Sequence, residues 1–316
     1  MVDRGQVAYS STRAAMDEVA LKRARDLTCA KGALVTLAGT ERTGTVSGAN
    51  RAEGHVRLTM AARRGATRRS RVAECGSLRV RFPAACAGAQ EAVLVNTAGG
   101  IAGGDRFSIA VTLEESAKLV VTTAAAEKIY RTDGPQAALA VTATLAADAE
   151  LTWLPQETIL FDRARLARTV DIAMAETARL VFAETVVFGR SAMGETVRDG
   201  QFADHWRVRR GGKLVFAENF RLDGAIAERL GEAAIAAGHV ALGTVLMVPS
   251  DESALDAARV VAGPFRGETG ISSWGGFCGG ITLARLAAPN GAALRHDLVM
   301  LLSALGRAPL PRIWLD

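Results

Sequence analysis

The sequence predicts a mainly β protein of stacked antiparallel or mixed sheets, with two or three helices toward the C-terminus. Three observations lead to this fold class. Apolar and polar residues alternate in many short segments, which is typical of half-buried strands. These segments follow one another at a spacing of roughly 10 residues. Helical periodicity is found mainly in the final third of the chain; outside it, only residues 12–25 look helical, and residues 176–184 suit either a strand or a helix turn. The shortage of helices between strands argues against repeated β–α–β units.

The strand-like segments begin near residue 55 and continue to residue 222. Residues 107–113 illustrate the pattern, with Phe, Ile, Val and Leu at every second position. Gly211 and Gly212 separate the last two segments and indicate a hairpin turn. The full set comprises residues 55–63, 77–82, 92–95, 107–113, 118–123, 139–145, 151–154, 166–174, 180–188, 202–209 and 214–222.

The remaining segments complete the domain organisation. Five arginines lie between Arg63 and Arg71, and this stretch is predicted to be a loop. We find no internal repeat and no linker, so residues 53–316 are predicted to form a single domain after a flexible extension at residues 1–52. Helices are expected at residues 226–237, 251–258 and 291–305, and strands at residues 240–248 and 277–286.

The net charge of +5 is unevenly distributed. Residues 1–82 hold 16 Lys and Arg residues against 7 Asp and Glu residues, whereas the rest has a net charge of −4. Such a basic region suits nucleic acid, a membrane surface, an acidic protein partner or plain solvation. Nucleic-acid binding through the segment from Arg63 to Arg71 is the alternative function. It is disfavoured because that segment has no aromatic residue for base stacking.

Targeting and catalytic signals are missing from the sequence. The N-terminus lacks the apolar run of a signal peptide, and no stretch suits a transmembrane helix, so a cytoplasmic protein without membrane contact is expected. There is no Cys-x-x-Cys spacing, no His-Glu-x-x-His motif and no nucleophile–base pair. The sequence therefore predicts no enzymatic activity and no tightly bound cofactor. The residues considered are Cys29, Cys75, Cys86, Cys278, His55, His205, His239 and His296.

A glycine-rich motif occupies residues 96–105, Asn-Thr-Ala-Gly-Gly-Ile-Ala-Gly-Gly-Asp. It lacks the spacing of dinucleotide and phosphate loops and does not lead into a helix. Asp105 can accept hydrogen bonds from the amides of the turn. Both a purely structural turn and a turn facing a ligand or partner remain open. The glycines that permit positive φ or close backbone approach are Gly99, Gly100, Gly103 and Gly104.

A second motif spans residues 153–162, Trp-Leu-Pro-Gln-Glu-Thr-Ile-Leu-Phe-Asp. Glu157 and Asp162 could ligate a cation, or they could simply be carboxylates at strand ends. A third motif, residues 188–195, reads Phe-Gly-Arg-Ser-Ala-Met-Gly-Glu and lacks the glycine spacing of a hydrolase elbow. We expect Arg190 to brace this turn through an ion pair with Glu195, with Glu184 as a further participant.

Together these motifs resemble the urease accessory protein UreD family, also called UreH. The resemblance covers about residues 55–290, although Ala98 stands where many members have a proline before the paired glycines. It implies a β-helix-like body without enzymatic activity. The matching segments, in the family's order, are residues 96–106, 122–123, 127–131, 151–162, 188–195 and 204–207.

The resemblance also implies partners and a cargo. Members act as scaffolds that bind urease apoprotein and the accessory protein UreF, which recruits the GTPase UreG. The assembly delivers nickel to urease in a step driven by GTP hydrolysis, and an internal water-filled passage is thought to carry the ion. Transient transport favours carboxylates and water over a His/Cys cage, because Ni²⁺ then exchanges faster. As a hypothesis, the carboxylates that line this passage are Asp105, Glu157, Asp162, Glu184 and Glu195.

Overall fold

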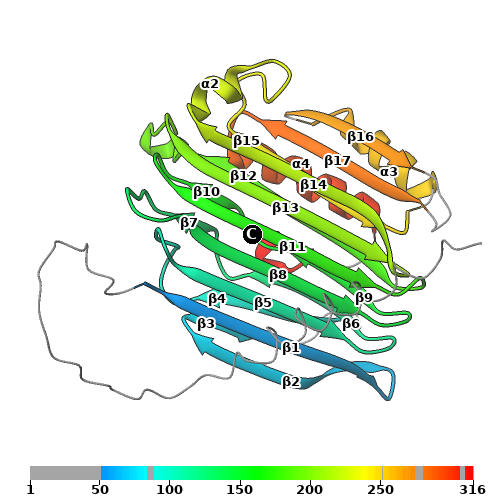
Figure 1. The fold of residues 1–316 in the computed structure, drawn as a ribbon. Helices are drawn as coiled ribbons and strands as arrows, with labels where there is room; N and C mark the ends of the chain where they lie inside the picture. Colours follow the sequence, from blue (N-terminus) through cyan, green and yellow to red (C-terminus); the bar gives the residue numbers. More distant parts are fainter. Residues whose placement is uncertain are drawn as a thin grey trace, which may run out of the picture. The chain divides into compact units, whose positions relative to one another are not determined.

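The computed structural model describes residues 51–83, 89–250, 252–265, 267–274, 280–306 and 310–315, which form two packed β-sheets with helices near the C-terminal end (Figure 1). The seven-stranded sheet has the order β14-β13-β11-β8-β5-β1-β2. Its strands are β1 (Glu53–Arg63), β2 (Ala66–Gly76), β5 (Arg106–Leu113), β8 (Ala137–Leu145), β11 (Arg165–Met174), β13 (Gly200–Arg210) and β14 (Lys213–Gly224).

The ten-stranded sheet has the main order β16-β17-β15-β12-β9-β6-β4-β3, and β10 joins β12 to β7 beside it. Its strands are β3 (Leu78–Arg81), β4 (Gln90–Asn96), β6 (Lys118–Thr123), β7 (Glu127–Ile129), β9 (Glu150–Leu154), β10 (Thr158–Leu160), β12 (Arg179–Phe188), β15 (Ala241–Val248), β16 (Glu268–Trp274) and β17 (Ile281–Ala288). The helices are α2 (Ile226–Gly231), α3 (Glu252–Ala262), α4 (Gly291–Leu305) and the short 3₁₀ helices η1 (Ser191–Met193) and η2 (Arg312–Trp314).

The middle of the chain winds as a β-solenoid. From β5 to β13 it passes alternately between the two sheets, so neighbours within each sheet pair in parallel. Parallel neighbours require a crossover connection, and here strands of the opposite sheet provide it. Antiparallel pairs form at the ends, as in β1–β2, β13–β14 and β15–β17. The predicted mainly β fold with mixed sheets is confirmed.

Three stacked turns lead from the seven-stranded to the ten-stranded sheet. Each ends at a fully buried alanine, Ala117, Ala149 or Ala178. The Glu150 amide donates to the Ala117 carbonyl at 2.9 Å, and the Arg179 amide donates to the Ala149 carbonyl at 2.8 Å. The turns therefore form a structural repeat that we did not predict from the sequence. Only short side chains fit where the turns stack, which explains the recurring alanine.

The core has two parts. Alternate residues of β12, such as Phe182, face the space between the sheets, whereas Val181 packs toward the helices. On that helical side α4 contacts β15 and β17, and it also contacts α3. Because both of its faces are covered, β12 is a continuous buried run of residues, as expected for a central strand. The buried residues of α4 are Ala293, Leu294, Asp297, Leu298, Leu301, Leu302 and Leu305.

Two local predictions are wrong. The stretch from Arg63 to Arg71 is not a loop, because only Arg64 and Gly65, both with positive φ, turn the chain between β1 and β2. The later arginines lie on β2, an edge strand whose exposed positions tolerate charge. The helix expected at residues 226–237 ends at Gly231, and the chain continues in turns, in which the Ala236 and Ala237 amides donate to the Glu232 carbonyl.

Other predictions are confirmed or lie partly outside the described residues. The strand at residues 240–248 matches β15, and the two C-terminal helices match α3 and α4. The strand expected at residues 277–286 corresponds to β17, although residues 275–279 lie outside the described part. The proposed extension, residues 1–52, is described only at Arg51 and Ala52.

Among the described residues, no helix combines the length and apolar character needed to cross a membrane.

Candidate functional site

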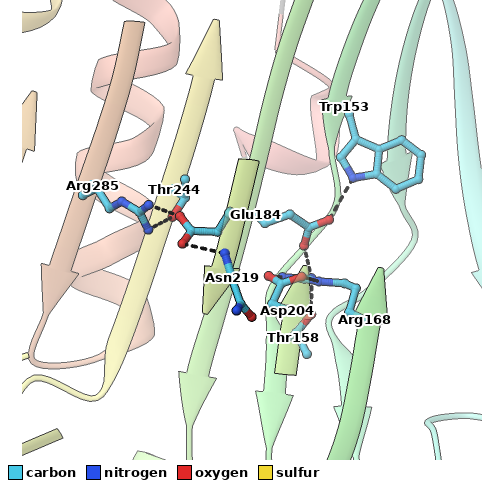
Figure 2. Close-up of polar contacts among 9 residues, drawn as sticks. Trp153, Thr158, Arg168, Glu184, Asp204, Asn219, Thr244 and Arg285 are labelled. Carbon is cyan, nitrogen blue, oxygen red and sulfur yellow. Dashed lines mark hydrogen bonds and ion pairs between the residues drawn. The ribbon is translucent and has the colours of Figure 1, made fainter. Parts of the chain in front are cut away.

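An arginine lies between the two sheets, bound to two carboxylates (Figure 2). Arg168 projects from β11, and its register neighbour Asp204 projects from the adjacent β13. The Arg168 Nε atom donates to Asp204 Oδ1 at 2.9 Å, and Nη2 donates to Asp204 Oδ2 at 2.6 Å. The Nη1 atom donates to Glu184 Oε2. The exposed fractions of Arg168, Asp204 and Glu184 are 2%, 5% and 6%.

The neighbours of Glu184 complete this buried cluster. The indole N–H of Trp153 on β9 donates to Glu184 Oε1 at 2.9 Å. Burial raises the pKa of Glu184, and the adjacent Arg168 opposes that shift. Burial acts to lower the pKa of Arg168, but the two carboxylates raise it overall. The arginine therefore stays charged, and it compensates the cost of burying carboxylates at this position.

Two cavities meet at the cluster. The larger cavity has a volume of about 350 Å³ and the smaller about 250 Å³, and both are lined by Arg168 and Glu184. Trp206 lines the larger cavity and Gln156 the smaller. Within the described part of the chain, the buried Nε1 of Trp206 and Nε2 of Gln156 have no hydrogen-bond partner. Buried N–H groups are normally satisfied, so water in the cavities is the expected acceptor.

A second ion pair lies at the larger cavity. Arg285 on β17 pairs with Glu218 on β14, and both residues line this cavity. The Arg285 Nη1 atom also donates to Thr244 Oγ1 at 3.4 Å (Figure 2). Burial lowers the pKa of Arg285. The larger cavity therefore has charged groups both at the central cluster and at this second pair.

The glycine motif forms a tight turn held by Asp105. This buried carboxylate accepts the Ala102 amide at 2.7 Å and the Ala52 amide at 2.8 Å. The predicted role of Asp105 in binding the turn's own amides is confirmed. Gly99 and Gly104 have φ values of 75° and 85°, which favour glycine.

The other two glycines of the motif allow close packing. A Cβ atom at Gly100 would lie 2.4 Å from the Tyr130 ring, and one at Gly103 would lie 2.1 Å from Thr132 Oγ1. Side chains at these two positions would clash with the segment that follows β7. The motif therefore joins the β4–β5 connection closely to the β7 region.

Glu127 on β7 links the first two motifs. Its carboxylate accepts the Asn96 side-chain amide at 3.0 Å, and its backbone amide donates to the Glu157 carbonyl at 2.8 Å. Glu127 also lines the smaller cavity. The glycine turn and the segment at residues 153–162 thus meet at one edge of this cavity.

Glu127 is expected to make the fold less stable as the pH rises from about 4.5 to about 7. Burial raises its pKa from 4.5 to about 7 in the folded protein, against a smaller opposing effect of the Asn96 hydrogen bond. In this window the unfolded chain has lost the proton that the folded protein retains, so raising the pH favours unfolding. The difference is on the order of 3 kcal/mol across the window.

Urea unfolding of the wild type and Glu127→Gln at several pH values measures this effect. The stability of the wild type relative to the variant should be greatest below pH 4.5, fall up to about pH 7 and then level off. Identical pH dependence of the two proteins would contradict the assignment.

Glu157, Asp162 and Glu195 lie outside the central cluster and have their own partners. Glu157 Oε1 lies 3.2 Å from Arg295 Nη1 of α4. Asp162 Oδ1 accepts the backbone amides of residues 198 and 199, at 2.7 and 3.2 Å. Glu195 pairs with Arg190 at 2.7 Å, which confirms the predicted ion pair, and it also accepts the Asp162 amide at 3.5 Å.

The structure therefore brings only part of the predicted set together. Asp162 and Glu195 meet at one turn, whereas Glu184 lies in the interior and binds Arg168. The expected participation of Glu184 in the Arg190 pair is wrong, because β12 directs its side chain into the space between the sheets. No group of three or more His, Cys, Asp or Glu residues suited to a metal ion occurs in the described ranges.

The sequence assigned no site role to Arg168 or Asp204, although Asp204 begins one of the segments that resemble the family and both residues interrupt an apolar pattern. Arg168 falls on the alternating apolar face of its strand, with Leu166 and Val170 on either side. Asp204 holds the equivalent position in β13, between Phe202 and Trp206 on the buried face. A charge on a predicted core face requires a partner. Arg168 and Asp204 lie on such faces of two strands and carry opposite charges, so each could have been proposed as the partner of the other.

Comparisons with known proteins identify the family. A family model described as UreD urease accessory protein matches residues 52–315. A urease accessory protein UreD of Rhodopseudomonas palustris is 54% identical over 269 residues, covering 85% of this chain and 95% of that protein. A UreD protein of Bradyrhizobium diazoefficiens is 50% identical over 274 residues, covering 87% and 98%. The chain belongs to the UreD urease accessory protein family.

Proposed function

We propose that this protein is a non-catalytic scaffold for urease maturation that binds urease apoprotein and UreF. Through UreF it acts with the GTPase UreG in the GTP-dependent insertion of nickel into the urease active site, in the cytoplasm. Membership of the urease accessory family supports the general role. The named partners and the nickel step are what we propose in addition to this general role.

The observation that carries the nickel step is the pair of cavities that meet at Arg168 and Glu184. Both are lined by Glu184, and both contain a buried N–H group suited to bound water. A share of roughly 30 Å³ per water allows several waters in each. Ni²⁺ moving with its water shell could exchange ligands with a carboxylate along such a route, because carboxylate and water ligands bind it less firmly than imidazole or thiolate.

Among the five predicted carboxylates, Glu184 is thus the primary candidate for contact with nickel. Glu157 instead lines a pocket near η1 and α4. Glu195 lines another pocket near η1 and α2. Asp105 and Asp162 accept backbone amides of turns. We assign these four carboxylates a structural role around the passage. Their substitution would affect nickel delivery only by disturbing the local structure.

Co-expression with the urease subunits and the other accessory proteins tests the proposal. Glu184→Gln should still join the complex in a pull-down, while the nickel content of purified urease falls roughly tenfold. The matched control is Glu115→Gln, which alters an exposed carboxylate at a stacked turn and should leave nickel content unchanged. Full nickel loading of urease with Glu184→Gln would contradict the proposed passage. Full nickel loading in the absence of this chain would overturn the maturation role.

A further inference from the structure

Arg168 lies where the two cavities meet. It lines both of them and is almost completely buried. Its guanidinium binds Asp204 through two nitrogens and Glu184 through a third. A further contact joins Arg168 Nη1 to Thr158 Oγ1 at 3.5 Å. The side chain therefore bridges three strands at the point where the cavities meet.

In this arrangement the junction is unfavourable for a metal cation. Both oxygens of Asp204 accept from Arg168, while the oxygens of Glu184 accept from Trp153 and from Arg168. A cation at the junction would thus face a fixed positive charge and carboxylate oxygens that already have donors. In a medium of low effective dielectric constant, this repulsion is strong. The observed position of Arg168 therefore blocks the proposed route.

The surroundings allow a second position for the guanidinium. The larger cavity adjoins Arg168, and it is also lined by Glu268, an exposed carboxylate able to accept from a displaced arginine. Movement of Arg168 into that cavity would expose the oxygens of Asp204 and Glu184 to the junction. The arginine and a divalent cation are then alternative partners of the same two carboxylates.

We infer that Arg168 is a gate in the interior passage, closed when it bridges Glu184 and Asp204 and open when a divalent metal cation replaces it there. This inference rests on the proposed nickel passage and adds a regulated step to it. Competition with the guanidinium keeps cation binding at the junction weak, so the ion is released and not retained. A purely structural arginine would not affect the affinity for metal.

Equilibrium dialysis of the purified full-length chain against NiSO₄ tests the gate directly. Arg168→Lys keeps the positive charge, but an ammonium group cannot reproduce the planar fork that engages Asp204 twice. The variant should bind one Ni²⁺ roughly tenfold more tightly than the wild type, and adding Glu184→Gln should reverse the gain. Arg209→Lys is the matched control, because it alters an exposed ion pair between the same two strands; it should leave Ni²⁺ binding unchanged.

The outcomes separate the gate from the passage. Circular dichroism first verifies that the variants are folded. Unchanged Ni²⁺ affinity in Arg168→Lys, together with reduced urease nickel content in Glu184→Gln, would overturn the gate while the passage stands. Unchanged urease nickel content in Glu184→Gln would overturn the passage itself. Tighter Ni²⁺ binding by Arg168→Lys and its reversal by Glu184→Gln would support the gate.

Discussion

Replacement of Arg168 by methionine is expected to lower the free energy of unfolding by about 3–5 kcal/mol. Methionine fills part of the space but leaves Glu184 and Asp204 buried next to each other without their cation. Removal of one member of a buried ion cluster lowers the free energy of unfolding by more than the intact cluster adds to it. The remaining charges are then desolvated and uncompensated. Urea denaturation followed by circular dichroism measures the loss.

A neutral triple variant is the control for this prediction. Arg168→Met combined with Glu184→Gln and Asp204→Asn removes the uncompensated charge while keeping similar volumes. We expect it to recover much of the lost stability, since neutral replacements avoid the cost of burying carboxylates. If Arg168→Met were as stable as the wild type, the ion cluster would not support the interior as described.

Replacement of Phe182 by alanine is expected to cost about 3–5 kcal/mol. Its ring is 1% exposed and lies between two tryptophans beside the central cluster. It stacks on Trp153 with ring centroids 5.7 Å apart and meets Trp206 edge-on at 4.8 Å. Alanine would lose these contacts and leave a void, which rigid sheets on both sides could fill only in part.

The matched variant Phe182→Leu should cost less, about 1–2 kcal/mol, because it retains most of the apolar volume. Thermal or urea unfolding compares the two variants, and near-ultraviolet circular dichroism reports on the adjacent tryptophans. Equal losses for alanine and leucine would show that cavity volume is not the source of the effect.

Much of the local structure could be predicted from the sequence. Period-2 alternation located most strands of the solenoid, and the helical period located α4. The shortest strands, β7 and β10, escaped because three residues carry too little periodicity. The stretch from Arg63 to Arg71 was wrongly predicted as a loop because a high density of charged residues is typical of loops. An edge strand also exposes such residues to solvent.

The stacked turns share a short sequence pattern from which they could have been predicted. Ala117, Ala149 and Ala178 each stand two residues before a strand's buried leucine, in segments that read Ser-Ala-Lys-Leu, Asp-Ala-Glu-Leu and Thr-Ala-Arg-Leu. The similarity is spread over few positions, so each turn looked ordinary by itself. Only their stacking shows why alanine recurs, because the next turn lies directly against it.

The sequence by itself determined the β class, the glycine turn capped by Asp105 and the family to which the chain belongs. Local patterns suffice for these, because alternation, turn chemistry and motif order are properties of neighbouring residues. Only the tertiary structure decided that the solenoid strands pair in parallel and that Arg168 meets Glu184 and Asp204 between two cavities. Alternation tells which face of a strand is buried. It does not tell which distant strand lies beside it, and the central cluster depends on that choice.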